Sequence, residues 1–478
     1  MSRGWRALLV TSVLAGLTAD PALAQIAPER TVPAAAKPPR TSTTPSQVRP
    51  KPTTGAAKTA PDALAPSNPD FKADQPTAQV APTPAPLPPA VWDVADAEEL
   101  LRYIAGVGKE GLEPTDYDPM ALQQAIQTGN IGAISAAATE SFDKLSSDLA
   151  LGHIKKPGRI DWWVADPDLN AAKRDGLLRS ALATHEIPQA LDALLPTHPQ
   201  YAALKAALAE TPAGDEAKRD RIRLNMDRWR WLPRDLGDKY IIVNVPGFHA
   251  TLVQDGVNRW KQRAIAGKLS TPTPQLNALA TGVILNPWWE VPKSIEHEAA
   301  GKKGFVPVVG ADGEVQRWRQ PPGPSNALGQ IKFVMPNSKA IYLHDTNARS
   351  RFNSDTRALS HGCVRTEHIL DLATQLLGDD GGEWTPDRIG AALDSKKSVQ
   401  ANFVKPVPVY IVYFSSAALN DGRIVDYKDL YGRDAKAMAA LHMKDGGASL
   451  TVPKDPDAAG QPVKPKPKPK PLDQVATR

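Results

Sequence analysis

The chain has 478 residues, a formal net charge of +5, 46 prolines and a single cysteine. This length allows about three domains, and the lone cysteine excludes an intramolecular disulfide framework. Because the charge is modest and no nucleic-acid motif occurs, the composition argues against a nucleic-acid-binding protein.

The first 24 residues are typical of a secretory signal. A short basic stretch with Arg3 and Arg6 precedes an apolar run over 7–19, and Ala22-Leu23-Ala24 provides a small-residue cleavage site. The apolar run is shorter than the roughly 20 residues that cross a bilayer. We therefore expect a cleaved signal and export to the periplasm, with an uncleaved anchor as the alternative. Residues 25–90 are rich in Pro and Ala, which predicts a disordered linker.

Residues 91–237 are predicted to form a helical domain. Asp96 to Glu99 fits a capping box at the start of a helix. Apolar side chains then recur at helical spacing in three stretches, at Ala97, Leu100, Leu101 and Ile104, at Phe142, Leu145 and Leu149, and at Tyr201, Leu204 and Leu208. We interpret Trp229 and Trp231 as core between helix and sheet rather than as a saccharide platform, and His153, His185 and His198 as surface or core residues.

Residues 238–435 are predicted to form a mainly β domain. Short β-branched runs separated by turns occur at 240–245, 249–253, around Trp260, and at 283–285, 332–335, 340–343 and 409–414. A helix is expected after Cys363, ending at Gly378, and another should start at Thr385-Pro386. The fold class is therefore α+β, with helices packed against the β domain.

Residues 436–478 are predicted to be a disordered tail rich in Lys and Pro. The repeat at 464–471 alternates the two residues, which favours an extended polyproline rod. This tail could make weak contacts with anionic polymers of the cell envelope, or it could be a solvated segment with no partner.

The one cysteine, Cys363, follows Ser360-His361-Gly362 and precedes Val364-Arg365. A thiol with a histidine base suffices for acyl transfer, and His344 at the end of a predicted strand could be that base. Asp345 could orient the imidazole through its side chain or its carbonyl. We expect Cys363 to lie just before a helix N-terminus, where amide groups favour an anion and, with Gly362, could hold an oxyanion.

Each of these residues also has a structural interpretation. Cys363 could be a small buried apolar residue, and His361 and Asp345 could hold a turn by hydrogen bonds. Arg365 suits a substrate carboxylate but could pair with a nearby acid. A zinc site from His344, His361 and Cys363 is a further alternative, although a fourth ligand at a usual spacing is missing.

The motif resembles the L,D-transpeptidases with a YkuD-type catalytic domain, whose signature is a histidine after a strand and then Ser/Thr-His-Gly-Cys with an apolar residue and Asn or Arg. Here these are His344 and residues 360–365. The stretches 224–233, 285–292, 320–324, 341–346 and 355–360 are similar to the large YcbB-like murein subgroup. The resemblance covers about residues 91–432.

The resemblance implies the role of each residue. Cys363 would be the acylated nucleophile and His344 its base, with His361 and Gly362 completing the catalytic set. Arg365, Tyr342, Ser360 and Asp345 are the predicted substrate-binding residues. The resemblance further implies peptidoglycan stem peptides as donor and acceptor, a 3→3 cross-link formed through a thioester, acylation by carbapenems, and no cofactor or metal.

Two departures from the subgroup are visible in the sequence. We expect the helical peptidoglycan-binding module that usually precedes the Trp- and Arg-rich helix to be missing, since only 211–215 separate the two predicted helices there. The capping insertion over the active site is short, at about 294–319. Two rival functions remain: a carboxypeptidase or wall-linkage hydrolase with the same nucleophile and water as acceptor, and a catalytically silent wall-binding scaffold. A papain-like peptidase is disfavoured because His344 precedes Cys363.

Overall fold

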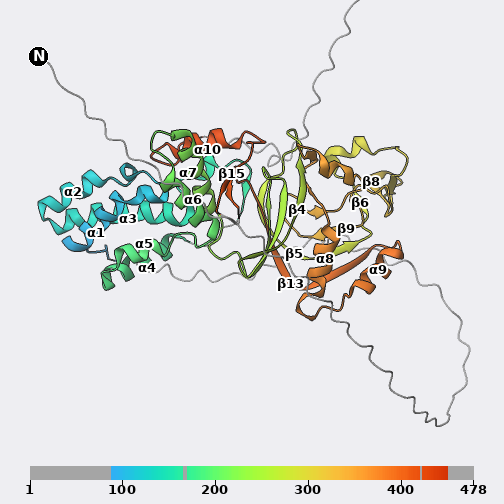
Figure 1. Cartoon of the computed structure of the whole chain (residues 1–478), viewed down its shortest axis with the longest axis horizontal. Helices are drawn as coiled ribbons and strands as arrows, with labels where there is room; N and C mark the ends of the chain where they lie inside the picture. Colours follow the sequence, from blue (N-terminus) through green and yellow to red (C-terminus); the bar gives the residue numbers. More distant parts are fainter. Residues whose placement is uncertain (1–87, 165–168, 420–421, 451–478) are drawn as a thin grey trace, which may run out of the picture. The chain divides into compact units, whose positions relative to one another are not determined.

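The computed structural model describes residues 88–164, 169–419 and 422–450. The predicted signal, almost all of the linker and the Lys/Pro repeat lie outside these residues. Helices dominate up to residue 230 and strands dominate afterwards (Figure 1), which confirms the α+β class. Over the described ranges we find no helix that combines the length and the apolar character needed to cross a membrane.

The helical part contains α1 (Val94–Ala105), α2 (Pro119–Thr128), α3 (Ile131–Leu151), α4 (Ala171–Thr184), α5 (Ile187–Asp192), α6 (Pro199–Glu210) and α7 (Glu216–Arg230). Helices α1 to α5 share one core, in which the predicted apolar positions of α1 and α3 are buried, except that Leu101 is only partly buried. The capping box was wrong: Asp93 is the N-cap of α1 and accepts a 2.8 Å hydrogen bond from the Asp96 amide. An aspartate three residues earlier offers the same cap, and the Asp96 carboxylate is buried against His185 instead.

The catalytic part is built on a ten-stranded sheet. Its path runs from β5 (Gln275–Leu285) through β13 (Val399–Val412), β2 (Lys239–Asn244), β3 (His249–Gln254), β4 (Val257–Gly267), β12 (Val364–Thr366) and β10 (Leu343–His344) to β9 (Ile331–Val334). Strand β9 also pairs with β5, so the path closes on itself. Two short strands, β1 (Trp162–Trp163) and β11 (Ala358–Ser360), pair with β5 and β4.

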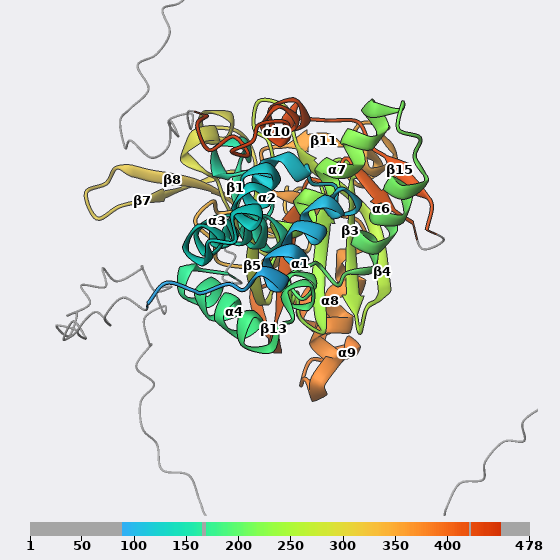
Figure 2. The same cartoon turned by 90° about the vertical axis from the view of Figure 1, so that its left-hand side faces the viewer.

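Two helices and a small sheet complete this part. Helix α8 (Ile369–Gly378) packs its apolar face into the core of the sheet, and α9 (Pro386–Asp394) begins after the N-cap Thr385, as expected from the sequence. The predicted capping insertion forms most of a separate three-stranded sheet, which consists of β6 (Trp289–Glu290), β8 (Val315–Gln320) and β7 (Val306–Val309). Its β7–β8 hairpin extends away from the other elements (Figure 2).

Helix α7 joins the helical part to the sheet. Trp229 stacks on Phe414, with ring centroids 4.7 Å apart, and belongs to a core shared by α6, α7, β2, β3 and β13. Asn225 accepts a hydrogen bond from the Ser415 amide and donates one to the Ser415 hydroxyl. Both Trp229 and Trp231 are buried, which agrees with their interpretation as core residues.

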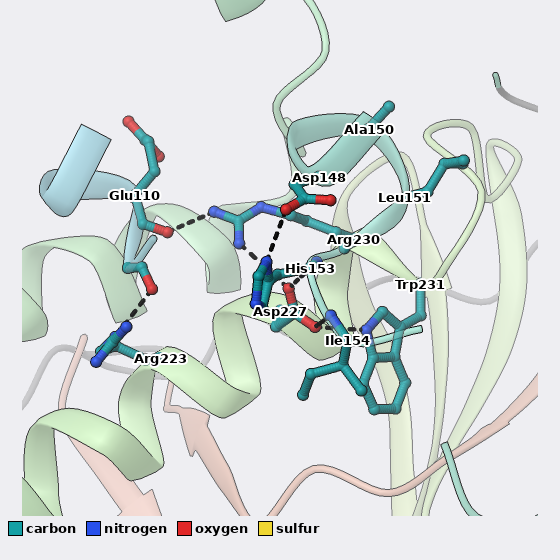
Figure 3. A network of polar contacts seen from close by, with 12 residues as sticks. Glu110, Asp148, Ala150, Leu151, His153, Ile154, Arg223, Asp227, Arg230 and Trp231 are labelled. Atoms are coloured by element: carbon teal, nitrogen blue, oxygen red, sulfur yellow. Dashed lines mark hydrogen bonds and ion pairs between the residues drawn. The ribbon is translucent and has the colours of Figure 1, made fainter. Parts of the chain in front are cut away.

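A buried polar network lies beside this junction (Figure 3). The Asp227 carboxylate accepts from the amides of His153 and Ile154 and from the Trp231 indole. The His153 ring lies 2.7 Å from Asp148 Oδ2 and 2.8 Å from the Met443 carbonyl. Because both partners are acceptors, the ring must carry two protons to satisfy them. The network therefore holds a buried imidazolium and ties the helical part to the C-terminal segment.

The C-terminal segment is folded further than predicted. Helix α10 (Arg433–Leu441) crosses the expected boundary at residue 436 and buries Ala437, Ala440 and Leu441 against α7. The alanines of this segment are apolar enough to cover Trp231, although their small size weakens the periodic signal in the sequence. Residues up to 450 are described, and residues 451–478 are not.

The His153 network predicts a pH-dependent stability. Burial lowers the pKa of His153, but the hydrogen bond and charge of Asp148 outweigh burial and raise it to about 9. A raised folded pKa stabilises the fold below the unfolded value of about 6.5, and this contribution is lost as pH rises through about 9. Denaturant titrations from pH 6.5 to 9.5 should show a loss in unfolding free energy of roughly 3 kcal/mol that His153→Gln removes.

Substitution of the exposed His297 by Gln serves as the control and should leave the wild-type pH dependence intact. If the wild type and His153→Gln showed parallel stability profiles over this pH range, the buried imidazolium would be refuted.

Candidate active site

The predicted catalytic residues meet where strands β10 and β12 pair in parallel. Leu343 lies opposite Val364, and His344 lies opposite Arg365. Leu343 and Val364 are fully buried in the core of the sheet. Since side chains alternate along a strand, Tyr342, His344, Cys363 and Arg365 all lie on the other face. On that face Tyr342 is the lateral neighbour of Cys363, and His344 is its diagonal neighbour.

Cys363 lies in the turn between β11 and β12, with its thiol 3.7 Å from the Ala340 carbonyl and in hydrogen-bonding contact with Tyr342. Burial raises the pKa of the thiol, while the Tyr342 hydrogen bonds and the charges of Lys332 and Arg365 act in the opposite direction. The expected helix N-terminus at Cys363 was wrong. Strand β12 intervenes, and α8 begins at Ile369. Residues 364–366 form β12 because they pair with β10 and β4, so the helix starts only after them.

The turn that carries Cys363 is held by two hydroxyl groups. The Ser360 hydroxyl donates to the Cys363 carbonyl at 2.5 Å and accepts from the Gly362 amide. The Thr273 hydroxyl donates to the Gly362 carbonyl at 2.7 Å. Gly362 has φ of 119°, a region that side-chain-bearing residues rarely adopt. Ser360, predicted to bind substrate, is buried and positions the nucleophile turn, and sequence reasoning missed Thr273.

His344 is fixed by a backbone group. Its Nδ1 donates to the Asp345 carbonyl at 2.6 Å, so Nε2 carries the free lone pair. Burial, and then the positive charge of Arg365, lower the pKa of His344 to about 3, so the ring is neutral. Within the described residues no hydrogen bond joins His344 to Cys363. The arrangement provides a neutral base one diagonal step from the thiol.

The Asp345 side chain points away from this face. Its carboxylate accepts from the Gln330 amide at 3.0 Å and from Arg349 at 2.8 Å. Asp345, predicted to bind substrate, thus acts through its carbonyl on His344, and its carboxylate holds the neighbouring loop. The question that the sequence left open, side chain or carbonyl, is settled in favour of the carbonyl.

His361 lies at the rim of the site. Its Nε2 is 3.0 Å from the Lys268 ammonium and 3.3 Å from the Glu298 carboxylate. Glu298 belongs to η4 (Lys293–Glu298), a short helix of the predicted capping insertion. His361 therefore connects the nucleophile turn to the capping segment and does not contact the buried His344.

The small sheet reaches the catalytic face through Trp289. Burial, and then the Cys363 thiol, raise the pKa of Tyr342, and hydrogen bonding by the Trp289 side chain acts in the opposite direction. Val291, Ile295 and Ala299 form the core of this segment. Short as it is, the capping segment contacts the site at both Tyr342 and His361.

Lys332 on β9 completes the catalytic face, and sequence reasoning missed it. It lies opposite His344 in the β9–β10 pairing, and its ammonium is 4.0 Å from the centre of the Tyr342 ring. The alternation of buried Ile331 and Phe333 with Lys332 was the available signal. The face thus carries two cations, Lys332 and Arg365, beside a thiol and a neutral histidine.

The zinc alternative finds no support in the geometry. Among the described residues, the group of side chains close enough to share a metal ion consists of Asp93, Asp96 and His185 in the helical part. His344, His361 and Cys363 do not form such a group there. Exposed acidic groups often cluster without an ion, so we assign no metal to either place.

Two family models match the chain in the order of its two folded parts. Residues 90–208 match a scaffold domain, and residues 238–411 match the L,D-transpeptidase catalytic domain, YkuD. A Haemophilus influenzae protein named "Putative L,D-transpeptidase" is 29% identical over 385 residues, which cover 72% of this chain and 75% of that protein.

Solved structures give weaker matches. An Enterococcus faecium L,D-transpeptidase mutant is 14% identical, with a TM-score of 0.22 over 38% of this chain and 52% of that one. An L,D-transpeptidase from Mycobacterium smegmatis is 15% identical, with a TM-score of 0.19 over 37% of this chain and 58% of that one. The chain thus spans little more than half of each solved structure, and TM-scores this low say nothing about its function.

The two family models and the curated relative agree with the architecture found here, a helical part followed by a mainly β part that carries the Ser-His-Gly-Cys turn. The chain therefore combines a YkuD-type L,D-transpeptidase catalytic domain with a preceding scaffold domain.

Proposed function

We propose that this protein is a periplasmic cysteine L,D-transpeptidase that forms 3→3 cross-links in peptidoglycan through a thioester on Cys363. The observation that carries the proposal is the shared face of β10 and β12, where a nucleophile, a neutral base and a cation are neighbours. The match of residues 238–411 to the L,D-transpeptidase catalytic domain supports the reaction class, and the apolar segment at 7–19 with its cleavage site supports export.

Acylation would begin with the neutral thiol. As Sγ attacks the carbonyl carbon of the third stem residue, His344 Nε2 takes the thiol proton. Because the pKa of His344 is so low, a standing imidazolium is unfavourable, and the proton moves as negative charge develops on the carbonyl oxygen. The C–N bond then breaks, and His344 returns the proton to the leaving amine of D-alanine.

The acceptor amine of a second stem would complete the cycle. It attacks the thioester carbonyl, the C–S bond breaks, and the amine proton passes through His344 to the thiolate. The charge of Arg365 would hold a substrate carboxylate, and Tyr342, which contacts the thiol, would border the reacting carbonyl. If water took the place of the amine, the same site would act as an L,D-carboxypeptidase or a wall-linkage hydrolase.

The first prediction of the proposal is a covalent adduct on one residue. Intact mass spectrometry of the chain from residue 25, incubated with a carbapenem or with a tetrapeptide stem, should show one adduct of the acyl group. Cys363→Ala should show none, and His344→Gln should acylate roughly a hundred- to ten-thousand-fold more slowly because the base is lost.

Addition of a second stem separates the alternatives. Formation of a cross-linked dimer supports the transpeptidase, and release of the tripeptide alone supports a hydrolase. A folded wild type that forms no adduct with either donor would shift the interpretation to the silent scaffold.

The second prediction concerns the protonation state of the thiol. Since burial raises the pKa of Cys363, the thiolate fraction below that pKa grows about tenfold per pH unit. The rate of alkylation by iodoacetamide should therefore rise about tenfold per unit between pH 6 and 8.

The denatured chain provides a matched control, because Cys363 is the one cysteine of the sequence. At each pH the denatured chain should react faster than the folded one. A plateau in the folded rate at neutral pH would instead indicate a preformed thiolate–imidazolium pair and contradict this picture.

A further inference from the structure

Two cations on the catalytic face lack anionic partners. Within the described residues, the side chains of Lys332 and Arg365 make no hydrogen bond or ion pair, and the Arg365 Nε atom is buried without an acceptor. Leaving a buried charge uncompensated is costly. Such a pair of cations is expected where a ligand supplies the opposite charge.

The strand register aims both cations at one place. Lys332, His344 and Arg365 occupy one row across the adjacent strands β9, β10 and β12. Neighbouring strands are about 4.8 Å apart, so His344 separates the two cations. The Lys332 ammonium does not remain in that row, because it lies over the ring of Tyr342, the lateral neighbour of Cys363. Both charges act electrostatically on the Cys363 thiol.

The surroundings do not neutralise this charge. Glu290 of the capping sheet acts on Lys332 electrostatically but is paired with Arg317 at 2.9 Å. Asp345 is paired with Arg349, and Arg351 adds further positive charge near Arg365. His344 is neutral, as is the thiol before attack. The resting site therefore carries an excess of positive charge.

We propose that Lys332 and Arg365 together bind the free carboxylate of the residue that leaves during acylation. This inference rests on the proposed function and deepens it, because it makes a free carboxylate beside the scissile bond a requirement for the acyl donor. In a peptide, three bonds separate the scissile carbonyl carbon from the carboxylate carbon of the leaving residue, a distance of about 4 Å. A cation beside Cys363 thus reaches that carboxylate while Sγ attacks.

The binding experiment uses Cys363→Ala, so that recognition is measured without turnover. Calorimetry compares a tetrapeptide stem with the same stem amidated at its terminal D-alanine. We expect the free acid to bind roughly ten- to a hundredfold more tightly, as is usual for a charge-assisted contact. Adding Lys332→Met should abolish most of this difference, and Lys332→Arg should keep it. Lys397→Met, a matched charge loss at an exposed position after α9, should change nothing.

Thiol reactivity distinguishes carboxylate binding from activation of the nucleophile. Iodoacetamide is neutral, so its alkylation rate reports the state of the Cys363 thiol and not carboxylate binding. Because the Lys332 charge lowers the pKa of the thiol, Lys332→Met in the wild-type background should slow alkylation. The Cys363→Ala background has no thiol, so the binding difference measured there is free of this effect. Equal binding of acid and amide stems by Cys363→Ala, or a binding difference that survives Lys332→Met, would overturn the proposal. Melting temperatures close to that of the parent protein exclude misfolding as the cause.

The two hypotheses fail in different ways. A Cys363→Ala protein that discriminates between acid and amide, with a wild type that forms no thioester, would refute the transpeptidase and keep the carboxylate site. A wild type that is acylated equally by both stems would refute the carboxylate site and keep the transpeptidase.

Discussion

The catalytic face depends on one constraint, the parallel register of β10 with β12. Pairing Leu343 with Val364 and His344 with Arg365 buries the two apolar residues and leaves the polar residues together on the opposite face. A slip of one residue in either strand would turn the polar side chains of that strand into the apolar core. Burial of Leu343 and Val364 therefore sets the register, and the chemistry of the site follows from it. The hydroxyls of Ser360 and Thr273 then fix the turn in which the thiol is presented.

The electrostatics of the face follow from its burial. Desolvation keeps His344 and the Cys363 thiol neutral, so neither compensates the charges of Lys332 and Arg365. The single hydrogen bond to the Asp345 carbonyl selects the tautomer that leaves Nε2 free to accept a proton. In this site the base can accept a proton and the thiol can donate one, but the two cations have no anionic partner. The site therefore favours an anionic substrate over a neutral one. The capping segment contributes Trp289 and Glu298 to the border of the same face.

The helical part packs directly against the catalytic sheet through a core and hydrogen bonds that they share. Helix α7 packs Trp229 against Phe414 and bonds Asn225 to Ser415, while Asp227 and His153 connect it to α3 and to the chain after α10. The tightly packed core and buried charges at this junction make independent motion of the two parts costly. Arg433, the first residue of α10, donates a hydrogen bond to the Thr273 carbonyl, next to the nucleophile turn. Helix α10 thus supports the nucleophile turn as well as the junction with α7.

The sequence by itself determined the α+β class, most strand and helix positions, and the candidate nucleophile and base, because hydrophobic period and a specific local motif carry that information. It misplaced the N-cap of α1 by three residues, since Asp93 and Asp96 are equally good caps. It also expected a helix N-terminus directly after Cys363, where pairing with β4 and β10 instead forms the strand β12. It also extended the unstructured tail over α10, whose alanines are buried only because Trp231 lies beneath them. Lys332 and Thr273 are 31 and 90 residues from Cys363 in the chain. Only the closed sheet brings them to the nucleophile, because contacts across strands depend on register and not on any local pattern.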